Sequence, residues 1–125
     1  MRLYHGIDIV NVDRLRETMD RSAAFVEDIF TQEEQRYCLS HRDPYVHFAG
    51  RFAAKEAFLK AIGSGFTAIG IFRRIEISVM PSGRPALRLN GWLDNLMRRL
   101  NASGASVTIS HTPEYAVSSV ILLGG

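Results

Sequence analysis

The sequence predicts an α+β fold, because helical patterns cluster in the first half of the chain and strand patterns lie mostly in the second. The 125 residues fit one domain, which we expect to span residues 1–125. A domain of this size buries only a modest core. A deep substrate pocket would therefore need a second subunit.

The composition is typical of a globular protein, with 46% hydrophobic and 22% charged residues. The formal net charge is only +2, so an acidic partner has to be recognised by a local basic patch, and we expect no nucleic-acid partner. No apolar run reaches the roughly 18 residues of a membrane span, and Arg2, His5 and Asp8 interrupt any signal peptide. The single cysteine, Cys38, fits a reducing compartment. We expect a soluble, cytoplasmic protein with no membrane partner.

The first strand is predicted over residues 3–10, which are rich in Ile and Val. Each of the next three helices begins at a residue that can cap it: Asn11 or Asp13, then Ser22, then Thr31 in a Thr-Gln-Glu-Glu capping-box pattern. The expected elements, in chain order, are a strand at 3–10, helices at 12–19, 22–30, 31–40 and 43–63, strands at 74–79 and 86–89, a helix at 91–101, and strands at 105–111 and 115–123.

The long central helix begins at Asp43-Pro44, with proline in its first turn, and ends at the Gly-Ser-Gly of residues 63–65. Residues 74–79 alternate as a strand, and the Pro-Ser-Gly-Arg-Pro of residues 81–85 forms the turn to its partner.

The next helix is amphipathic through Trp92 and Leu96, and we expect Gly104 to end it. The last two strands form a hairpin around Thr-Pro-Glu at residues 112–114.

The central helix has one face that we assign to the core. Phe48, Phe52 and Leu59 share a stripe that Phe58 and Ile62 extend. A further smooth side, which could pack closely against a strand, consists of Ala54, Ala57 and Ala61.

Glu56 and Lys60 on this helix are neighbours at i and i+4, and the small Ala49 and Ala53 beside them leave room for a ligand. An ordinary intrahelical ion pair is the alternative. Asp8 favours the ligand, since it lies in an apolar strand on the same side as Gly6, which clears space above the strand.

Asp8 itself has two simpler explanations, a salt bridge or a cap on the helix that starts at Val12. Together, however, Asp8 and Glu56 suit Mg²⁺ bound with a phosphorylated substrate, because Mg²⁺ prefers oxygen ligands and is often held by one or two carboxylates. Lys60 would then balance the phosphate charge.

Two further segments carry polar groups. Hydroxyls and the His111 imidazole at residues 108–112 can bind phosphate or ribose oxygens, although a single histidine at a strand end is often incidental. The turn Ser82-Gly83-Arg84-Pro85 exposes Arg84 and is otherwise an ordinary turn.

Four motifs together resemble the small bacterial 4′-phosphopantetheinyl transferases, the holo-(acyl-carrier-protein) synthase family. They are the Gly-Ile-Asp-Ile-Val of residues 6–10, the Gly-Arg-Phe-Ala-Ala-Lys-Glu-Ala-Phe-Leu-Lys-Ala of residues 50–61, the turn at residues 82–85 and the Ile-Ser-His-Thr of residues 109–112. The resemblance spans the whole chain in order. It implies an antiparallel sheet packed against the long central helix, in a homotrimer with sites between subunits.

The resemblance also implies an activity: Mg²⁺-dependent transfer of phosphopantetheine from the substrate coenzyme A to a serine of apo acyl carrier protein, which supports fatty acid biosynthesis. Adenosine 3′,5′-bisphosphate would be the other product. Glu56, directly or through a metal-bound water, is the candidate base, although a tight metal ligand is a poor free base. The implied residue roles are Asp8 and Glu56 as Mg²⁺ ligands, Lys60 at the pyrophosphate, and Arg51, Ser82, Gly83, Arg84, Pro85 and His111 near the coenzyme A nucleotide.

An acidic carrier protein would need a basic surface, and our candidates for docking are Arg14 and Arg21 with the apolar Phe25. A mixed solvated face is the alternative. The sequence departs from the family pattern at residues 65–74, where Arg73-Arg74 stands in place of an acidic residue.

Two other functions fit less well. A Mg²⁺-dependent nuclease also uses Asp, Glu and Lys, but its lysine usually follows an acidic residue on a strand, whereas Lys60 lies one helical turn after Glu56. A non-catalytic coenzyme A-binding module is the other alternative.

Overall fold

The computed structural model describes residues 1–63 and 70–125 and confirms the α+β fold. The predicted end of the central helix at Ser64 and Gly65 lies outside the described residues. The elements are β1 (Arg2–Asn11), α1 (Val12–Arg21), α2 (Ala23–Ile29), α3 (Gln32–Leu39), α4 (Pro44–Ala61), the short 3₁₀ helix η1 (Phe72–Arg74), β2 (Ile75–Val79), β3 (Pro85–Leu89), α5 (Trp92–Arg99), β4 (Ala102–His111) and β5 (Tyr115–Gly124).

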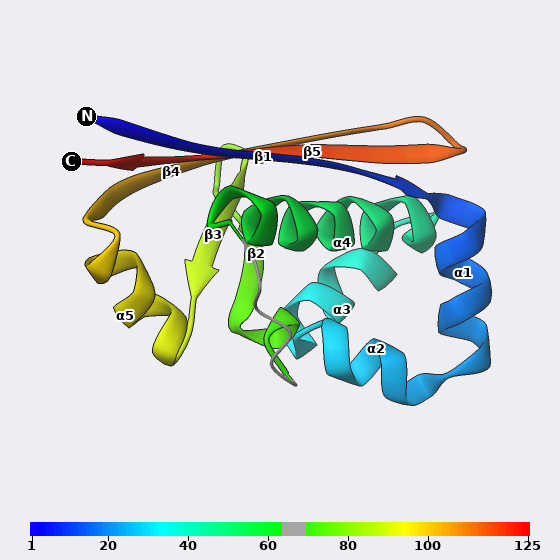
Figure 1. The fold of residues 1–125 in the computed structure, drawn as a ribbon. Coiled ribbons are helices and arrows are strands. Elements are labelled where there is room, and N and C mark those ends of the chain that lie inside the picture. The colour runs from blue at the N-terminus through cyan, green and yellow to red at the C-terminus, as the bar shows by residue number, and fades with distance from the viewer. Residues whose placement is uncertain (64–69) are drawn as a thin grey trace.

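The long helix α4 lies along one face of an antiparallel sheet, as predicted (Figure 1). The strand order of this sheet is β1-β5-β4. The opposite face of this sheet carries no helix in the described part of the chain. Helices α1, α2 and α3 gather around the N-terminal half of α4, while the hairpin β2–β3 and α5 lie toward its C-terminal half. Helix α4 thus covers one face of the sheet, and no helix of the described residues covers the other face.

Side chains cap the helices where the sequence predicts. The Asn11 side chain, rather than that of Asp13, accepts the backbone N–H of Arg14 at the start of α1. Ser22 caps α2, and Thr31 forms the reciprocal capping box with Glu34 at the start of α3. These caps satisfy backbone donors that a helix start leaves unpaired.

The prediction that Gly104 ends the fifth helix is wrong. The helix ends at Arg99, and Asn101 takes the left-handed backbone conformation with φ of 55°. Asparagine tolerates that conformation, so the chain turns into β4 three residues earlier than expected. Gly104 instead lies inside β4, at an irregularity in its pairing with β5.

Close approach of α4 to β1 depends on Gly6. A Cβ on Gly6 would lie 1.9 Å from the carbonyl oxygen of Ala57 and 2.7 Å from the amide nitrogen of Ala61. The alanine side of the helix therefore packs closely on a strand, as predicted. The space above Gly6, however, is filled by helix backbone and is not free for a ligand, which corrects the sequence-based interpretation of that glycine.

The buried surface of α4 is also wider than the single core stripe that the sequence predicts. Phe48, Phe58 and Leu59 are buried, but so are Arg51 and Lys55, and among the described α4 side chains the helix is covered on nearly every side. Its N-terminal half joins a cluster with α1, α2 and α3, and its C-terminal half joins one with β2, β4, β5 and α5. No helix among the described residues is long and apolar enough to cross a membrane.

Candidate active site

Asp8 and Lys60 meet where β1 passes α4. Lys60 Nζ lies 3.0 Å from Asp8 Oδ1 and also donates to the carbonyl oxygen of Ile7 at 3.2 Å. The Asp8 side chain is 16% exposed and that of Lys60 is 54% exposed, so the lysine can leave this pair for a ligand while Asp8 stays in place. Of the two alternatives for Asp8, the salt bridge is present and the cap is not.

Glu56 lies beside this pair without a partner of its own. It is half-buried and makes no hydrogen bond or ion pair with any other described residue. Burial raises the pKa of its carboxyl group, the Asp8 carboxylate raises it further, and Lys60 opposes the rise. Among the described residues, Lys60 is the cation that pairs with Asp8, and it also faces the charge of Glu56.

Asp8 and Glu56 line the same cleft, which has a volume of about 440 Å³. Its walls come from β1, from α1, from Phe25 of α2 and from Phe52 of α4. The ring centroids of Phe25 and Phe52 lie 6.1 Å apart. The cleft lining therefore combines two carboxylates with two neighbouring aromatic rings.

The residues proposed for carrier docking divide between this cleft and its surroundings. Arg14 and Phe25 line the cleft. Arg21 is exposed at the end of α1 and is not among the cleft residues. The guanidinium of Arg16 lies over the ring of Tyr45 at 4.8 Å, so it belongs to a separate contact.

The donor set of the cleft fits a hard divalent cation. Asp8 and Glu56 offer only oxygen ligands, and the Glu56 carboxylate has no hydrogen bond or ion pair within the described ranges. Within the described ranges no three His, Cys, Asp or Glu side chains form a metal cluster. A bound Mg²⁺ would complete its coordination with water and substrate oxygens, which is usual for this ion.

Arg51, in the N-terminal half of α4, marks a second polar region. Its side chain is only 5% exposed, and its guanidinium stacks over the ring of Tyr37 at 4.1 Å. In the described part of the chain no carboxylate lies within ion-pair distance of it, and its Nε lacks a hydrogen-bond partner. A buried cation without a counter-charge favours an anionic ligand.

Three histidines surround this region, of which only His111 was predicted from the sequence. The ring centroids of His41 and His47 are 3.8 Å apart, and those of His47 and His111 are 5.6 Å apart. All three line a cavity of about 540 Å³. Burial, His41 and Arg51 lower the pKa of His47 to about 4. No sequence motif links these histidines, because only the packing of α4 against β4 brings them together.

The turn at Ser82–Pro85 is exposed and tight, with Gly83 at φ of 91°. Arg84 and Pro85 border a cavity that β4 residues Ala105 to Val107 complete. Neither Arg51 nor Asp8 lines this cavity. The residues predicted to bind the nucleotide therefore do not form one site within a single chain.

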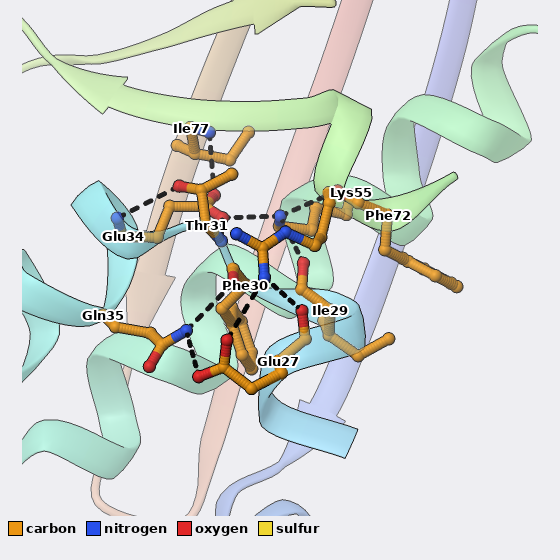
Figure 2. A network of polar contacts seen from close by, with 10 residues as sticks. Glu27, Ile29, Phe30, Thr31, Glu34, Gln35, Lys55, Phe72 and Ile77 are labelled. Carbon is orange, nitrogen blue, oxygen red and sulfur yellow. Dashed lines mark hydrogen bonds and ion pairs between the residues drawn. The ribbon is translucent and has the colours of Figure 1, made fainter. Parts of the chain in front are cut away.

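Lys55, a buried charge of the central helix, is paired with Glu34. Lys55 Nζ lies 2.6 Å from Glu34 Oε1, and both side chains are fully buried. The second Glu34 oxygen accepts the backbone N–H of Ile77 at 2.9 Å, so the pair ties α3 and α4 to β2 (Figure 2). A buried lysine needs a partner, but the sequence does not show which residue that partner is.

Arg73, which departs from the family pattern, binds α2. Its Nη1 donates to the carbonyl oxygen of Glu27 at 2.5 Å and lies 3.4 Å from the Glu27 carboxylate.

Known proteins resemble this chain along nearly its whole length. Residues 5–118 match the model of the 4′-phosphopantetheinyl transferase superfamily. A curated holo-(acyl-carrier-protein) synthase from Koribacter versatilis is 41% identical over 123 residues, which cover 98% of each chain.

Two solved structures are similar in both sequence and fold. The holo-(acyl-carrier-protein) synthase from Neisseria meningitidis shares 30% identity, covers 96% of this chain and 97% of its own, and has a TM-score of 0.85. The one from Bacillus anthracis, in complex with CoA (3′,5′-ADP), shares 30% identity over 98% and 96% of the two chains, with a TM-score of 0.77.

Proposed function

The chain belongs to the 4′-phosphopantetheinyl transferase superfamily, and from this premise we propose that it transfers phosphopantetheine from coenzyme A to a serine of apo acyl carrier protein. The observation that carries the proposal is the meeting of two carboxylates, Asp8 and Glu56, with Lys60 beside one cleft. Relatives bear the name of this activity, and the Bacillus anthracis structure holds a CoA-derived ligand.

We propose that Asp8 and Glu56 hold Mg²⁺. Asp8 is fixed by the strand and by Lys60, whereas the Glu56 carboxylate has no other described partner. When bound, the ion would offset the charge of the coenzyme A pyrophosphate and of the departing phosphate.

Residues of this chain would assist the transfer of the phosphopantetheine group and the removal of the serine proton. The carrier serine oxygen attacks the β-phosphorus of coenzyme A, the bond from that phosphorus to the bridging oxygen breaks, and adenosine 3′,5′-bisphosphate leaves. Lys60 would turn from Asp8 to the pyrophosphate and hold the negative charge that develops there. Glu56 lies beside the same cleft and would take the serine proton, directly or through water.

The coenzyme A nucleotide would use the second polar region. Arg51 is buried beside His47 with no carboxylate partner in the part of the chain that the structure describes, and the His111 ring neighbours that of His47. Phosphate oxygens would satisfy both the guanidinium and the imidazoles. The turn Ser82–Pro85 would contact the nucleotide from a neighbouring subunit, because it lies at a different cavity of its own chain.

Carrier docking would involve the cleft wall. Arg14 offers a positive charge and Phe25 an apolar surface at the same cleft as Asp8, and Arg21 would extend the basic surface along α1. A carrier bound there would present its serine next to the carboxylates.

We propose a homotrimer, supported by the open face of the three-stranded sheet. Leu3, Ile7 and Ile9 of β1 and Ile121 and Leu123 of β5 are all exposed there, on the side that faces away from α4. Several exposed apolar side chains on one face of a sheet usually mark an interface. A second copy would also complete the nucleotide site with its turn.

Intact-protein mass spectrometry tests the activity. Apo acyl carrier protein incubated with the enzyme, coenzyme A and MgCl₂ should gain the mass of one phosphopantetheine, and EDTA should abolish the gain. Absence of any gain with several carriers would contradict the proposal. Mg²⁺-dependent plasmid cleavage instead would favour the nuclease alternative.

A further inference from the structure

Helix α2 is held at its C-terminal end by side chains from other elements. The helix has seven residues and no basic residue in its last turn. A helix this short is marginal by itself, and its last carbonyl groups lack intrahelical partners. Its position must therefore come from contacts that the rest of the fold supplies.

Three donors from three elements bind these carbonyl oxygens (Figure 2). Lys55 Nζ of α4 donates to Ile29 O at 2.8 Å, and Gln35 Nε2 of α3 donates to Phe30 O at 3.0 Å. Arg73 Nη1 of η1 donates to Glu27 O at 2.5 Å. Two of the three donors are cations, which also offset the partial negative charge at a helix C-terminus. We call Lys55, Gln35 and Arg73 the α2 clamp.

The other end of α2 reaches the candidate active site. Phe25 lies one turn before Ile29, so both face the same side of the helix, and Phe25 lines the cleft that contains Asp8. Its ring contacts Phe52, and Phe52 stacks on Phe72 with centroids 5.8 Å apart. The carbonyl oxygen of Phe72 accepts a hydrogen bond from Lys55 at 2.9 Å. The two aromatic side chains that line the cleft are thus both linked to the clamp. Phe25 is linked through α2, and Phe52 is linked through Phe72 and its hydrogen bond with Lys55.

We propose that the α2 clamp positions Phe25 for the carrier protein, and that Arg73 is the member through which carrier affinity can be changed without loss of the fold. The inference rests on the proposed function. Lys55 is buried with Glu34, so its removal would leave a buried carboxylate unpaired. The side chains of Arg73 and Glu27 are instead 37% and 53% exposed, so water can replace their contact.

Arg73→Met tests the clamp, with Arg88→Met as matched control, since Arg88 is also an exposed arginine with a single carboxylate partner, Glu76, at 3.5 Å. We expect the KM for the carrier to rise about five- to tenfold in Arg73→Met, as for the net loss of one ordinary hydrogen bond at a partly exposed contact. The KM for coenzyme A and kcat should stay within about twofold, since Arg73 touches neither Asp8 nor Glu56. Arg73→Lys should restore most of the affinity, because an ammonium group can still donate to Glu27 O. An unchanged carrier KM, or an equal rise in both KM values, would overturn the proposal.

A double-mutant cycle with Phe25→Ala shows whether Arg73 acts through Phe25. Arg73→Met should add little to the carrier KM of Phe25→Ala, because both changes remove the same contact. Fully additive effects would refute the clamp as a positioning device.

Hydrogen exchange separates failure of the clamp from failure of the proposed function. Amides of residues 23–30 should exchange faster in Arg73→Met than in wild type and Arg88→Met, at nearly unchanged global stability. Unchanged exchange in these residues would overturn the clamp even in an active enzyme. A wild-type protein that transfers nothing would instead refute the proposed function and leave the exchange result standing.

Discussion

Lys60 Nζ lies 3.0 Å from Asp8 Oδ1, joining two residues that are 52 positions apart in the chain. The pair sets a cation beside Asp8, which lines the same cleft as Glu56. Because Lys60 is more exposed than Asp8, it is the mobile partner. It can therefore exchange one oxyanion for another when a phosphate arrives.

Lys60→Met should lower kcat by about 100-fold and raise the KM for coenzyme A, because it removes a charge that would stabilise the departing phosphate. The free energy of unfolding should fall by about 1 kcal/mol, since Lys60 is 54% exposed but its partner Asp8 is only 16% exposed. Steady-state kinetics and urea denaturation measure the two quantities. A Lys60→Met enzyme with near-wild-type kcat would exclude a role for Lys60 at the phosphates.

Gly6→Ala should destabilise the protein by about 3 kcal/mol or more, because the new methyl group overlaps the backbone of α4 and forces helix and strand apart. Gly104→Ala is the control, since its Cβ would meet nothing nearer than Leu123 Cδ1 at 3.8 Å. Urea denaturation should show a large shift of the midpoint for the first variant and a small one for the second. Equal shifts would mean that the approach of α4 to β1 does not depend on this glycine.

His47 should make stability depend on pH. Its pKa is lowered to about 4 in the folded protein, against a reference value of 6.5, so below pH 6.5 the unfolded chain binds the proton more readily. The stabilisation of the folded state by neutral His47 is complete above pH 6.5. It decreases as the pH falls from 6.5 to about 4 and does not change further at lower pH. Solvent screening at this half-buried site limits the loss to about 1 kcal/mol.

The measurement is the difference in unfolding free energy between wild type and His47→Gln at several pH values. Carboxylates titrate in both proteins and cancel in the difference. Wild type should lose stability relative to the variant between pH 6.5 and pH 4. Parallel curves would show that the imidazole titrates equally in the folded and unfolded chains.

Leu3→Glu should dissociate the proposed homotrimer, because it sets a charge on the open apolar face of the sheet. Leu39→Glu is the matched control: the exposures of Leu3 and Leu39 are 65% and 64%, but Leu39 lies on α3. Light scattering coupled to size-exclusion chromatography should give a trimer mass for wild type and Leu39→Glu and a monomer mass for Leu3→Glu. A wild-type monomer, or a trimeric Leu3→Glu protein, would contradict this use of the sheet face.

Local signals predicted much of the fold. Asn11, Ser22 and Thr31 cap the helices that follow them, because a cap depends only on residues within one turn. Asp8 and Glu56 could be selected as site candidates because charges in apolar elements need a reason. That both line one cleft follows from the packing of β1 against α4.

Contacts between distant segments could not be predicted. Glu34 was assigned to a capping box, and its second role as the partner of Lys55 depends on how α3 meets α4. His41 and His47 join His111 only through tertiary packing. Gly6 was interpreted as space for a ligand, since the sequence does not show that α4 fills that space.

The rate at which apo acyl carrier protein gains phosphopantetheine in Asp8→Ala and Glu56→Ala tests the central claim most directly. Each variant should lose at least about 100-fold in Mg²⁺-dependent rate, since each removes one of the two proposed ligands. Circular dichroism should show an intact fold in both. A wild-type rate in either variant would contradict the assignment of Asp8 and Glu56 as the metal ligands.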